Sequence, residues 1–261
     1  MILFHTNYCT KGRFNMIRFI SIIIFIGLYF IASILFFPTL IIIGLFSRHL
    51  RDVISFYMIK GVFYIVTFMS GTKATVIGLE NIPKDRAVLY VGNHRSIVDI
   101  ILGYKYIPSV TGFVSKKEVK SWPFFAQWMW FLNCLFLDRK DIKAGLETIL
   151  AAIEKVKSGI SMFIFPEGTR SKVEGQMLDF KEGSFKIATK SGCPIVPVAF
   201  SGTGLIFEDH FPKVTAEHVV IEFCKPIYPN ELSREEQKTL GRDTQQIIEK
   251  TLEKNNCQLK A

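Results

Sequence analysis

The sequence predicts an α/β fold: a mostly parallel sheet with helices on both faces, preceded by N-terminal membrane-associated helices. From residue 74 onward, short apolar runs alternate with segments of helical periodicity, which is the pattern of strands joined by crossover helices. Before that region, the stretch Phe19–Ser47 contains no charged residue, which is typical of a segment that enters a bilayer. The chain of 261 residues is long enough for one medium-sized domain with additional helices.

The uncharged stretch Phe19–Ser47 is longer than a simple membrane crossing requires. As one helix it would extend about 43 Å, against a hydrocarbon core of about 30 Å. Pro38 divides it, and Phe19–Phe37 alone would reach about 28 Å, which is enough to cross. Two arrangements fit: a single span, or a shallow helical hairpin that bends near Pro38 and stays in one leaflet. Length alone favours the span, while the basic residues on the two flanks are balanced and give no orientation.

The segments on either side of this stretch complete the N-terminal region. Residues 1–18 form a basic leader, within which Met16 is a second candidate start. The apolar segment Val53–Met69 is interrupted by Lys60 and rich in Phe and Tyr, which indicates either an interfacial helix or an ordinary core helix. We therefore expect three regions: the leader at 1–18, a span or hairpin plus an interfacial helix at 19–70, and a folded domain at 71–261.

Strand and helix signals alternate through the folded domain. Asp141 is an N-cap candidate for one helix, and Ser233 with Glu236 forms a capping-box pattern at the start of the last. Gly192, followed by Pro194, ends another helix. Strands are expected at residues 74–78, 87–92, 111–115, 134–138, 161–165, 195–200 and 218–223, and helices at 97–104, 122–131, 141–157, 183–191 and 233–253. In such a sheet, ligand sites gather beyond the carboxyl ends of the strands.

The charge of the chain points to an anionic partner. The net charge is +9 and the pI is about 9.3, which fits a membrane surface, a phosphorylated substrate or nucleic acid. No nucleic-acid-binding motif is present and the basic residues are dispersed, so a lipid phosphate is the simplest partner. The scattered cysteines indicate free thiols in a reducing compartment rather than a zinc site or disulfides. They are Cys9, Cys134, Cys193, Cys224 and Cys257, of which Cys134 and Cys193 lie in apolar stretches typical of a core.

The segment Asn93–Asp99, shortly after the apolar run Ala87–Val91, pairs a histidine with an aspartate. Histidine is suited to accept a proton near neutral pH, and a nearby aspartate can fix its tautomer. On an ideal helix five residues turn the chain by about 140°, so the side chains of His94 and Asp99 would not share a face. The pair meets only if His94 lies at a strand end and Asp99 in the first turn of the next helix. A hydrogen-bonded pair without a catalytic role has the same spacing.

A second polar loop, Phe165–Ser171, follows the apolar run Met162–Phe165. Its Glu-Gly-Thr-Arg sequence brings backbone N–H groups, a hydroxyl and a guanidinium into one tight turn, and arginine suits bidentate binding of phosphate. A solvated turn with an internal Glu–Arg pair would have the same sequence. Because His94, Arg139 and Glu167 each lie just after a predicted strand of a parallel sheet, one cleft can hold all three.

Together these motifs resemble the glycerolipid acyltransferase family, and specifically 1-acylglycerol-3-phosphate acyltransferases. That family carries N-H-x-x-x-x-D as its first block and F-P-E-G-T-R-S as its third. Leu135–Arg139 resembles the second block and Ile195–Ala199 the fourth, so all four occur in order. One position departs from the pattern: Asn133 stands where the second block usually has a small residue, often glycine. This difference bears on the local backbone and not on the role of Arg139.

The resemblance implies a reaction and a set of roles. An acyl group would pass from acyl-CoA or acyl carrier protein to the 2-hydroxyl of 1-acyl-sn-glycerol 3-phosphate (lysophosphatidic acid), giving phosphatidic acid for phospholipid biosynthesis, with no metal and no further cofactor. His94 would remove the hydroxyl proton as the oxygen attacks the thioester carbonyl, and Asp99 would orient His94. The substrate-binding residues would be Arg139, Glu167, Gly168, Thr169, Arg170 and Lys116. The enzyme would sit at the cell membrane with its catalytic domain facing the cytoplasm, where acyl thioesters are made.

Several alternatives stay open at this point. A serine acyl-enzyme at Ser96 lacks the Gly-x-Ser-x-Gly elbow that such a nucleophile needs. Lys116 and Lys117 can equally form a solvated basic turn. The acceptor can be another lyso-lipid, since the motifs report phosphate and hydroxyl chemistry rather than the head group. A non-catalytic membrane-bound lipid-binding protein on the same fold is disfavoured by the intact His94 and Asp99.

Overall fold

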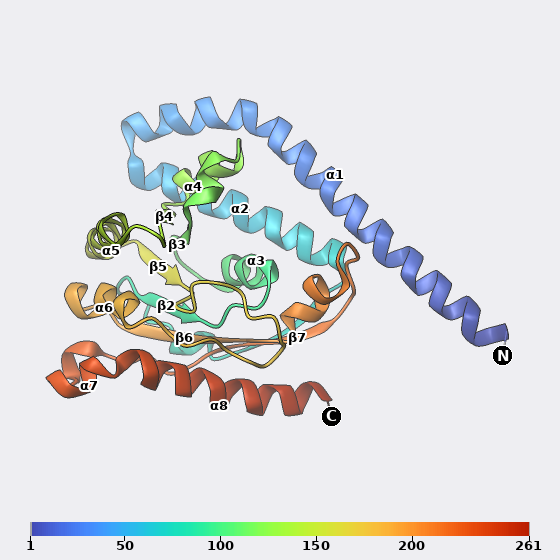
Figure 1. Cartoon of the computed structure of the whole chain (residues 1–261). Coiled ribbons are helices and arrows are strands. Elements are labelled where there is room, and N and C mark those ends of the chain that lie inside the picture. Colours follow the sequence, from blue (N-terminus) through green and yellow to red (C-terminus); the bar gives the residue numbers. More distant parts are fainter. Residues whose placement is uncertain (1, 261) are drawn as a thin grey trace.

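A seven-stranded sheet lies at the centre of the chain, which the computed structural model describes over residues 2–260, with side chains from 15 to 259 (Figure 1). The strands are β1 (Lys73–Ile77), β2 (Leu89–Gly92), β3 (Thr111–Lys116), β4 (Leu135–Leu137), β5 (Ser161–Ile164), β6 (Ile195–Ser201) and β7 (His218–Phe223). Their order is β1-β7-β6-β2-β5-β3-β4, and all neighbours are parallel except β6 and β7. Each predicted strand overlaps an observed one, so the predicted mostly parallel α/β fold is confirmed.

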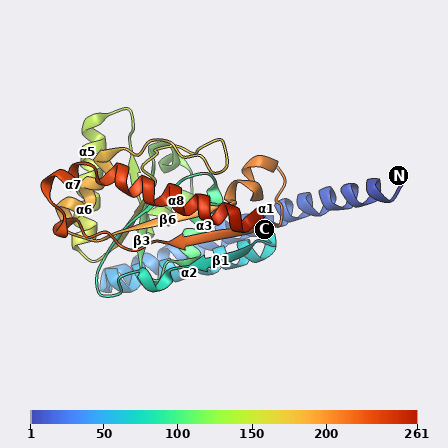
Figure 2. The ribbon, with the colours of Figure 1, turned by 90° about the horizontal axis from the view of Figure 1, so that it is seen from below.

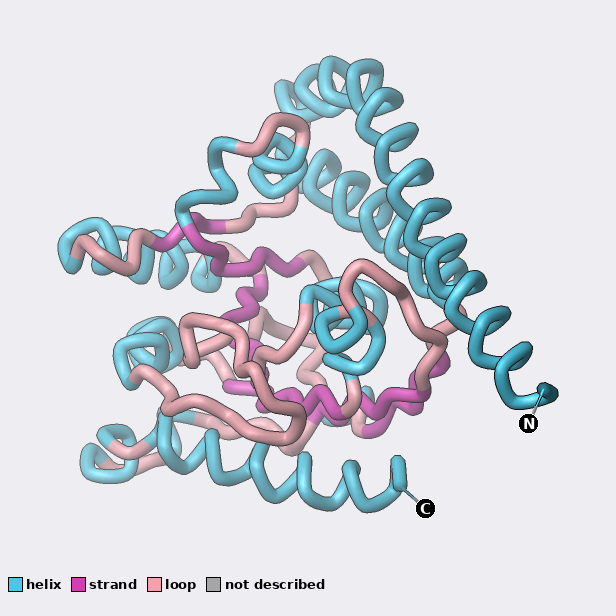
Figure 3. The backbone as a smooth tube through the Cα atoms, turned by 45° about the vertical axis from the view of Figure 1, so that its right-hand side comes forward, coloured by secondary structure: helices cyan, strands magenta, loops and turns pink. Residues whose placement is uncertain are grey.

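Helices cover both faces of the sheet, as predicted (Figures 2 and 3). One face is covered by α1 (Ile2–Phe46), α2 (Arg48–Ser70), α3 (Ile97–Tyr106) and α4 (Phe125–Phe131), and the other by α5 (Ile142–Lys157), α6 (Lys186–Ser191), α7 (Arg234–Lys238) and α8 (Leu240–Lys260). Strand side chains alternate between these two layers: on β2, Tyr90 packs into the first, and Leu89 and Val91 pack into the second. Short 3₁₀ helices lie at Leu79–Asn81, Lys117–Ser121, Glu182–Phe185, Thr203–Ile206, Glu208–His210 and Pro229–Glu231.

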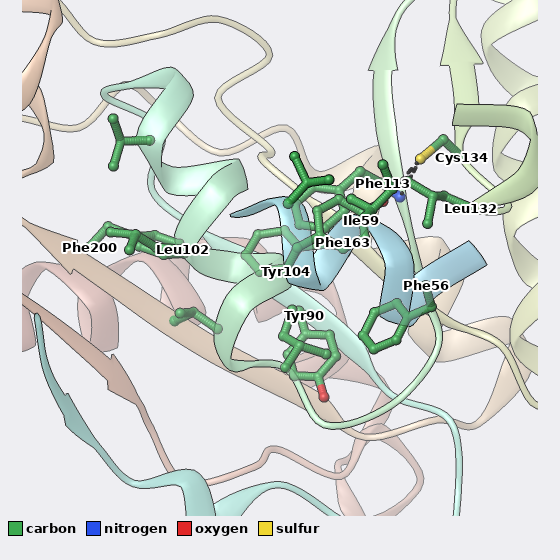
Figure 4. Close-up of a cluster of buried hydrophobic side chains, with 14 of the residues drawn as sticks. Phe56, Ile59, Tyr90, Leu102, Tyr104, Phe113, Leu132, Cys134, Phe163 and Phe200 are labelled. Carbon is green, nitrogen blue, oxygen red and sulfur yellow. Dashed lines mark hydrogen bonds between the residues drawn. The ribbon is translucent and has the colours of Figure 1, made fainter. Parts of the chain in front are cut away.

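Aromatic rings dominate the core between the sheet and the first layer (Figure 4). Phe113 on β3 and Phe163 on β5 stack with their ring centroids 4.6 Å apart, and Tyr104 of α3 lies 4.5 Å from Phe113. Phe56 of α2 is fully buried in the same cluster. Burying each such side chain contributes about 1.5–3 kcal/mol, so this core joins α2 and α3 firmly to the strands that carry the polar loops.

Local signals set most of the helix ends. Asp141 caps α5 by accepting hydrogen bonds from the N–H groups of Lys143 and Ala144, and Ser233 forms the predicted capping box with Glu236. Gly192 ends α6 in the left-handed conformation at φ 77°. These three positions confirm the sequence assignments.

Several predicted helix boundaries are wrong. The helix expected at 183–191 is α-helical only from Lys186, after the 3₁₀ helix Glu182–Phe185, and the last helix continues past residue 253 to Lys260. The helix expected at 233–253 is divided at Thr239, because the carboxylate of Glu182 accepts hydrogen bonds from the N–H groups of Gly241 and Arg242 and thereby caps α8 separately. The helix expected at 122–131 begins only at Phe125, because Phe124 has a φ of 61°, outside the helical region.

The N-terminal helices differ from expectation in where the chain turns. The predicted bend near Pro38 is wrong as a break, since α1 continues through Pro38 to Phe46 and the chain reverses at Ser47, whose side chain caps α2. An apolar helix tolerates a proline where neighbouring elements support it. The leader is continuous with α1, and its side chains up to residue 14, including Cys9, lie outside the described side chains. Both Asn15–Phe46 and Arg48–Ser70 are long and apolar enough to cross a membrane, with mean hydropathy 2.7 and 1.6.

The second helix, α2, serves two environments. Phe56, Ile59 and Val66 are buried against the domain, as a core helix requires, whereas Phe68 is 86% exposed and Tyr64 is 49% exposed. The core-helix interpretation of Val53–Met69 is therefore confirmed for one face, and the exposed apolar face leaves the interfacial interpretation as a prediction. The predicted free thiols are confirmed for the four cysteines with described side chains, which are Cys134, Cys193 and Cys224 (buried) and Cys257 (exposed).

Candidate functional site

The carboxyl ends of five strands meet at one edge of the sheet, because β2 to β6 are mutually parallel. A cavity of about 400 Å³ opens there and extends between the domain and helices α1 and α2. Most of the predicted site residues line it, namely His94, Lys116, Arg139, Gly168, Thr169 and Arg170. Asp99 and Glu167 lie behind this lining, where both are buried. The prediction of one cleft is confirmed for His94 and Arg139, whereas Glu167 supports the loop from behind the lining.

His94 and Asp99 meet in the way their spacing requires. His94 follows β2 and Asp99 lies in the first turn of α3, so His94 Nδ1 is 3.0 Å from Asp99 Oδ2. The imidazole also stacks on the ring of Phe165, with the two centroids 4.1 Å apart. A carboxylate on one side and a ring face on the other fix the orientation of His94.

Asp99 is fully buried and held by four hydrogen bonds. Oδ2 accepts from the backbone N–H groups of Arg95 and Ser96, each at 2.8 Å, and Oδ1 accepts from Thr203 Oγ1 at 2.6 Å. An ionised carboxylate is only an acceptor, so we assign the fourth hydrogen bond to an N–H on His94 Nδ1. His94 Nε2 then carries the lone pair that a general base needs.

Ser96 has a structural task at the same turn. It is fully buried, its Oγ accepts from the N–H of Val98 as the N-cap of α3, and it donates to the carboxylate of Glu208. A hydroxyl engaged in this way is not presented to the cavity, so the serine acyl-enzyme alternative finds no support in the geometry.

Glu167 holds the two polar loops together. One carboxylate oxygen accepts from the N–H of His94 at 2.6 Å and the other from the N–H of Leu178 at 2.8 Å, and the residue is only 4% exposed. Burial raises the pKa of Glu167 to about 7, although the two hydrogen bonds act in the opposite direction. Glu167 therefore supports the backbone beneath His94. The internal Glu–Arg pair considered for this turn is wrong, because Arg170 pairs with Glu208 instead, at 2.7 Å.

The basic residues at the cavity differ in their surroundings. Lys116 and Arg139 are exposed, and no carboxylate partner for either occurs among the ion pairs of residues 15–259. Lys117, by contrast, pairs with Asp138. Lys116 thus stays available for an anion while Lys117 forms part of an ordinary charged turn, which separates two neighbours that the sequence could not.

The conformation and contacts of Asn133 explain how this residue can stand where the second block usually has a small one. Its φ of 59° lies in the left-handed region that favours glycine and that asparagine tolerates better than most residues. Its side chain donates to Asp52 Oδ2 of α2 and accepts from Lys155 Nζ of α5, both at 2.8 Å. The substitution preserves the backbone conformation before Arg139 and adds a link between α2 and the sheet edge.

Thr203 and Glu208 contact the two polar loops, and Phe165 stacks on His94 from within the second loop, but none of the three was selected as a site residue from the sequence. Thr203 follows the predicted strand 195–200, so the rule of strand carboxyl ends applied to β6 would have found it. Glu208 begins the short 3₁₀ helix Glu208–His210, far along the chain from both loops, and only the tertiary fold brings it to Arg170.

The remainder of the cavity is apolar. Its lining includes Ile26, Tyr29 and Phe30 from α1, Ile59, Val62, Phe63 and Val66 from α2, and Ile100, Ile101 and Tyr104 from α3. An apolar chamber that begins at a histidine and a set of cations suits an amphipathic ligand with an anionic head group and a hydrocarbon chain.

Comparisons with known proteins agree with this chemistry. The family model Acyltransferase matches residues 73–201. A 1-acyl-sn-glycerol-3-phosphate acyltransferase of Borreliella burgdorferi is 30% identical over 203 residues, which cover 76% of this chain and 79% of that protein. One from Cocos nucifera is 35% identical over 172 residues, covering 66% of this chain and 55% of that protein. The chain therefore spans only about half the length of several such relatives.

The fold is likewise similar to a solved structure. The crystal structure of the 1-acyl-sn-glycerophosphate (LPA) acyltransferase PlsC from Thermotoga maritima superposes with a TM-score of 0.74 at 28% sequence identity. The match covers 92% of this chain and 95% of that one, so it includes the N-terminal helices as well as the sheet.

Proposed function

Because the chain belongs to the 1-acylglycerol-3-phosphate acyltransferase family, we propose that it moves a fatty acyl group from an acyl thioester to the 2-hydroxyl of 1-acyl-sn-glycerol 3-phosphate. The product would be phosphatidic acid. The observation that carries this proposal is the oriented His94–Asp99 pair at the junction of an apolar chamber and a group of cations. The thioester, acyl-CoA or acyl carrier protein, is a co-substrate, and the reaction needs no further cofactor.

The reaction uses His94 as a base and then as an acid. Nε2 takes the proton of the 2-hydroxyl as its oxygen attacks the thioester carbonyl, and Asp99 stabilises the imidazolium through Nδ1–H. The tetrahedral intermediate then breaks its C–S bond, and the departing thiolate receives the proton from Nε2. One C–O bond forms, one C–S bond breaks and the proton ends on sulfur. The substrate hydroxyl is the nucleophile, so no serine or cysteine of the protein is required.

The cations around His94 bind the phosphate of the acceptor in this proposal. Arg139, Arg170 and Lys116 line the same cavity as His94, and guanidinium groups suit bidentate contact with phosphate oxygens. Arg170 donates to Glu208 through Nη1, and a guanidinium has further N–H donors with which to bind phosphate. Gly168 and Thr169 shape the turn that presents Arg170. The apolar lining from α1, α2 and α3 accommodates hydrocarbon, so the head group and a chain occupy opposite ends of one cavity.

An assay of the full-length chain in membranes tests the reaction. Lysophosphatidic acid is offered with acyl-CoA and, separately, with acyl carrier protein, and phosphatidic acid formation is measured. Two further acceptors are compared. Lysophosphatidylcholine tests whether another lyso-lipid is preferred, and monoacylglycerol tests whether the enzyme requires the acceptor phosphate. Absence of transfer to lysophosphatidic acid from either donor would refute the proposal, and a faster reaction with another lyso-lipid would change the acceptor.

The N-terminal helices also suggest how the enzyme meets its lipid. We propose that α1 and α2 form a hairpin in the cytoplasmic leaflet of the cell membrane, with the domain on the cytoplasmic side. Supporting contacts run along α1: Phe19 stacks on Phe207 at 5.9 Å, and Tyr29 stacks on Trp128 at 5.3 Å. A helix held against the domain over this length does not leave it to cross the bilayer, which outweighs the argument from length for a single span. The opposite face of α1 exposes apolar side chains such as Leu35, at 74%.

Tagging separates the hairpin from the span. A hairpin places an N-terminal tag and residue 75 on the same, cytoplasmic side, so protease added to sealed inside-out vesicles should cleave the tag. Full protection of the tag there would establish the span. The protein should in either case resist extraction by high salt and alkaline washing, because its attachment is apolar rather than ionic.

A further inference from the structure

A second, smaller cavity lies beside the polar loop Phe165–Ser171 and is lined by Lys181, a cation that the sequence motifs did not include. It has a volume of about 40 Å³ and lies at the carboxyl ends of β3, β4 and β5. Its polar lining consists of Arg139, Lys181, Ser115 and Ser184, next to the backbone of Gly168. At roughly 10–15 Å³ for each water-sized group, the cavity has room for about three such groups, which is the scale of the oxygens of a phosphate.

Lys181 is fitted closely against the catalytic loop. Its Nζ lies where a side chain on residue 168 would begin, since a Cβ added to Gly168 would be only 2.9 Å from it. The backbone N–H of Lys181 donates to the carbonyl of Pro166 at 3.2 Å. Gly168 thus serves two purposes: it adopts a φ of 75° and it leaves space for the Lys181 ammonium.

Within residues 15–259, the side chains of Lys181 and Arg139 form no ion pair. The neighbouring acid, Glu182, is directed to α8, where it accepts from the N–H groups of Gly241 and Arg242. Two cations and two hydroxyls around one small cavity form a site for an anion.

We propose that Lys181 and Arg139 form a phosphate-binding subsite, with Ser115 and Ser184 donating to the remaining oxygens. The ligand is a phosphate ester carried by one of the two substrates: the monoester of the lipid acceptor, or the phosphates of the thioester donor, which both coenzyme A and a phosphopantetheine arm possess. The inference rests on the proposed acyltransferase function and adds Lys181 to its binding residues.

The test compares charge and size at position 181 in the full-length enzyme. Lys181→Met keeps the aliphatic stem against Gly168 and removes the charge, whereas Lys181→Arg keeps the charge. Lys190→Met, an exposed position on α6 outside the cavity lining, controls for the change in net charge. We expect Lys181→Met to raise one KM roughly three- to tenfold, Lys181→Arg to raise it less, and Lys190→Met to leave it unchanged.

The substrate whose KM changes identifies the source of the phosphate. If the subsite binds the acceptor, the KM for lysophosphatidic acid rises and the preference for it over monoacylglycerol falls. If it binds the donor, the KM for acyl-CoA rises while the rate with a phosphate-free acyl pantetheine is unaffected. An active, folded Lys181→Met enzyme with both KM values at wild-type level would overturn the subsite.

A binding measurement keeps this result separate from the proposed function. Inorganic phosphate and free coenzyme A should each raise the melting temperature of the wild-type protein more than that of Lys181→Met. If the wild type and Lys181→Met both transfer acyl groups with the same KM values and show the same melting-temperature shifts, the subsite is rejected and the proposed function stands. If the melting-temperature shifts depend on Lys181 but the wild type transfers no acyl group, the proposed function is rejected and the subsite stands. If the wild type shows neither transfer nor a shift, both proposals fail.

Discussion

The two sides of the cavity entrance are built in opposite ways. On the side of the base, Asp99 is fully buried with four hydrogen bonds, and His94 is fixed between that carboxylate and the ring of Phe165. On the side of the cations, Lys116 and Arg139 are exposed and no carboxylate pairs with them among residues 15–259. Folding therefore orients the proposed base in advance, whereas the cations would acquire their partner when an anionic ligand binds. Substitutions on the first side should lower kcat, and those on the second should raise KM.

The largest effect is expected at the base itself. His94→Ala should reduce kcat by about 10²- to 10⁴-fold, because it removes the proposed proton acceptor for the substrate hydroxyl. The measurement is phosphatidic acid formation at saturating substrate, with a melting curve to establish that the variant is folded. Loss of a general base should lower the rate by at least about 10²-fold. If a folded, membrane-bound His94→Ala variant keeps more than about a third of the wild-type rate, His94 is not the general base.

Glu167, behind the base, should make the stability of the buried side depend on pH. Burial raises its pKa from 4.5 to about 7, so the stabilisation associated with its protonated form is present below pH 4.5 and is lost as the pH rises through 7. This change in the free energy of unfolding amounts to about 3 kcal/mol. The stability difference between wild type and Glu167→Gln, measured by denaturation from pH 4 to pH 8, should vary across that interval.

The control for that series is Glu147→Gln, a substitution on the exposed face of α5. A stability difference for Glu167→Gln that stays constant across the interval would mean that the buried carboxylate does not titrate there. The variant also loses an acceptor, since a glutamine amide cannot accept from both His94 and Leu178, so a constant offset is expected beneath the pH-dependent part.

Thr203 tests whether the orientation of Asp99 matters apart from its charge. Thr203→Val leaves Asp99 Oδ1 buried without its 2.6 Å hydrogen bond, which should cost about 1–3 kcal/mol of stability and lower kcat with little change in KM. Thr203→Ser keeps the hydroxyl and should restore most of the rate. If the valine and serine variants show the same kcat, the hydroxyl does not act on the base through Asp99.

The smallest effect is expected for a conservative change on the cation side. Arg139→Lys keeps the charge and removes the bidentate guanidinium, so the KM for the phosphorylated acceptor should rise by about threefold to tenfold with kcat nearly unchanged. The decisive quantity is the ratio of kcat/KM for lysophosphatidic acid to that for monoacylglycerol. An unchanged ratio means that Arg139 does not bind the acceptor phosphate.

The sequence predicted the sheet more accurately than the helical N-terminus, for a physical reason. Strands and capped helices are encoded by short-range patterns, such as the alternation at Leu89, Tyr90 and Val91 or the cap at Asp141. The uncharged run Phe19–Ser47 has no such internal signal, so both a single span and a hairpin bent near Pro38 fitted the sequence, whereas the chain reverses at Ser47. Whether a proline breaks an apolar helix depends on the elements packed around it rather than on the proline alone.

The sequence alone determined the fold class, the meeting of His94 with Asp99 across a strand–helix turn, and the presence of Arg139 and Arg170 at strand ends. Each follows from residues close in the chain, where the period of a strand or a helix fixes direction. Only the tertiary structure decided that Thr203 holds Asp99, that Glu208 pairs with Arg170, that Lys116 is available while Lys117 is not, and that Lys181 lies on Gly168. Such contacts join segments far apart in sequence, and their partners are selected by packing, which no local pattern encodes.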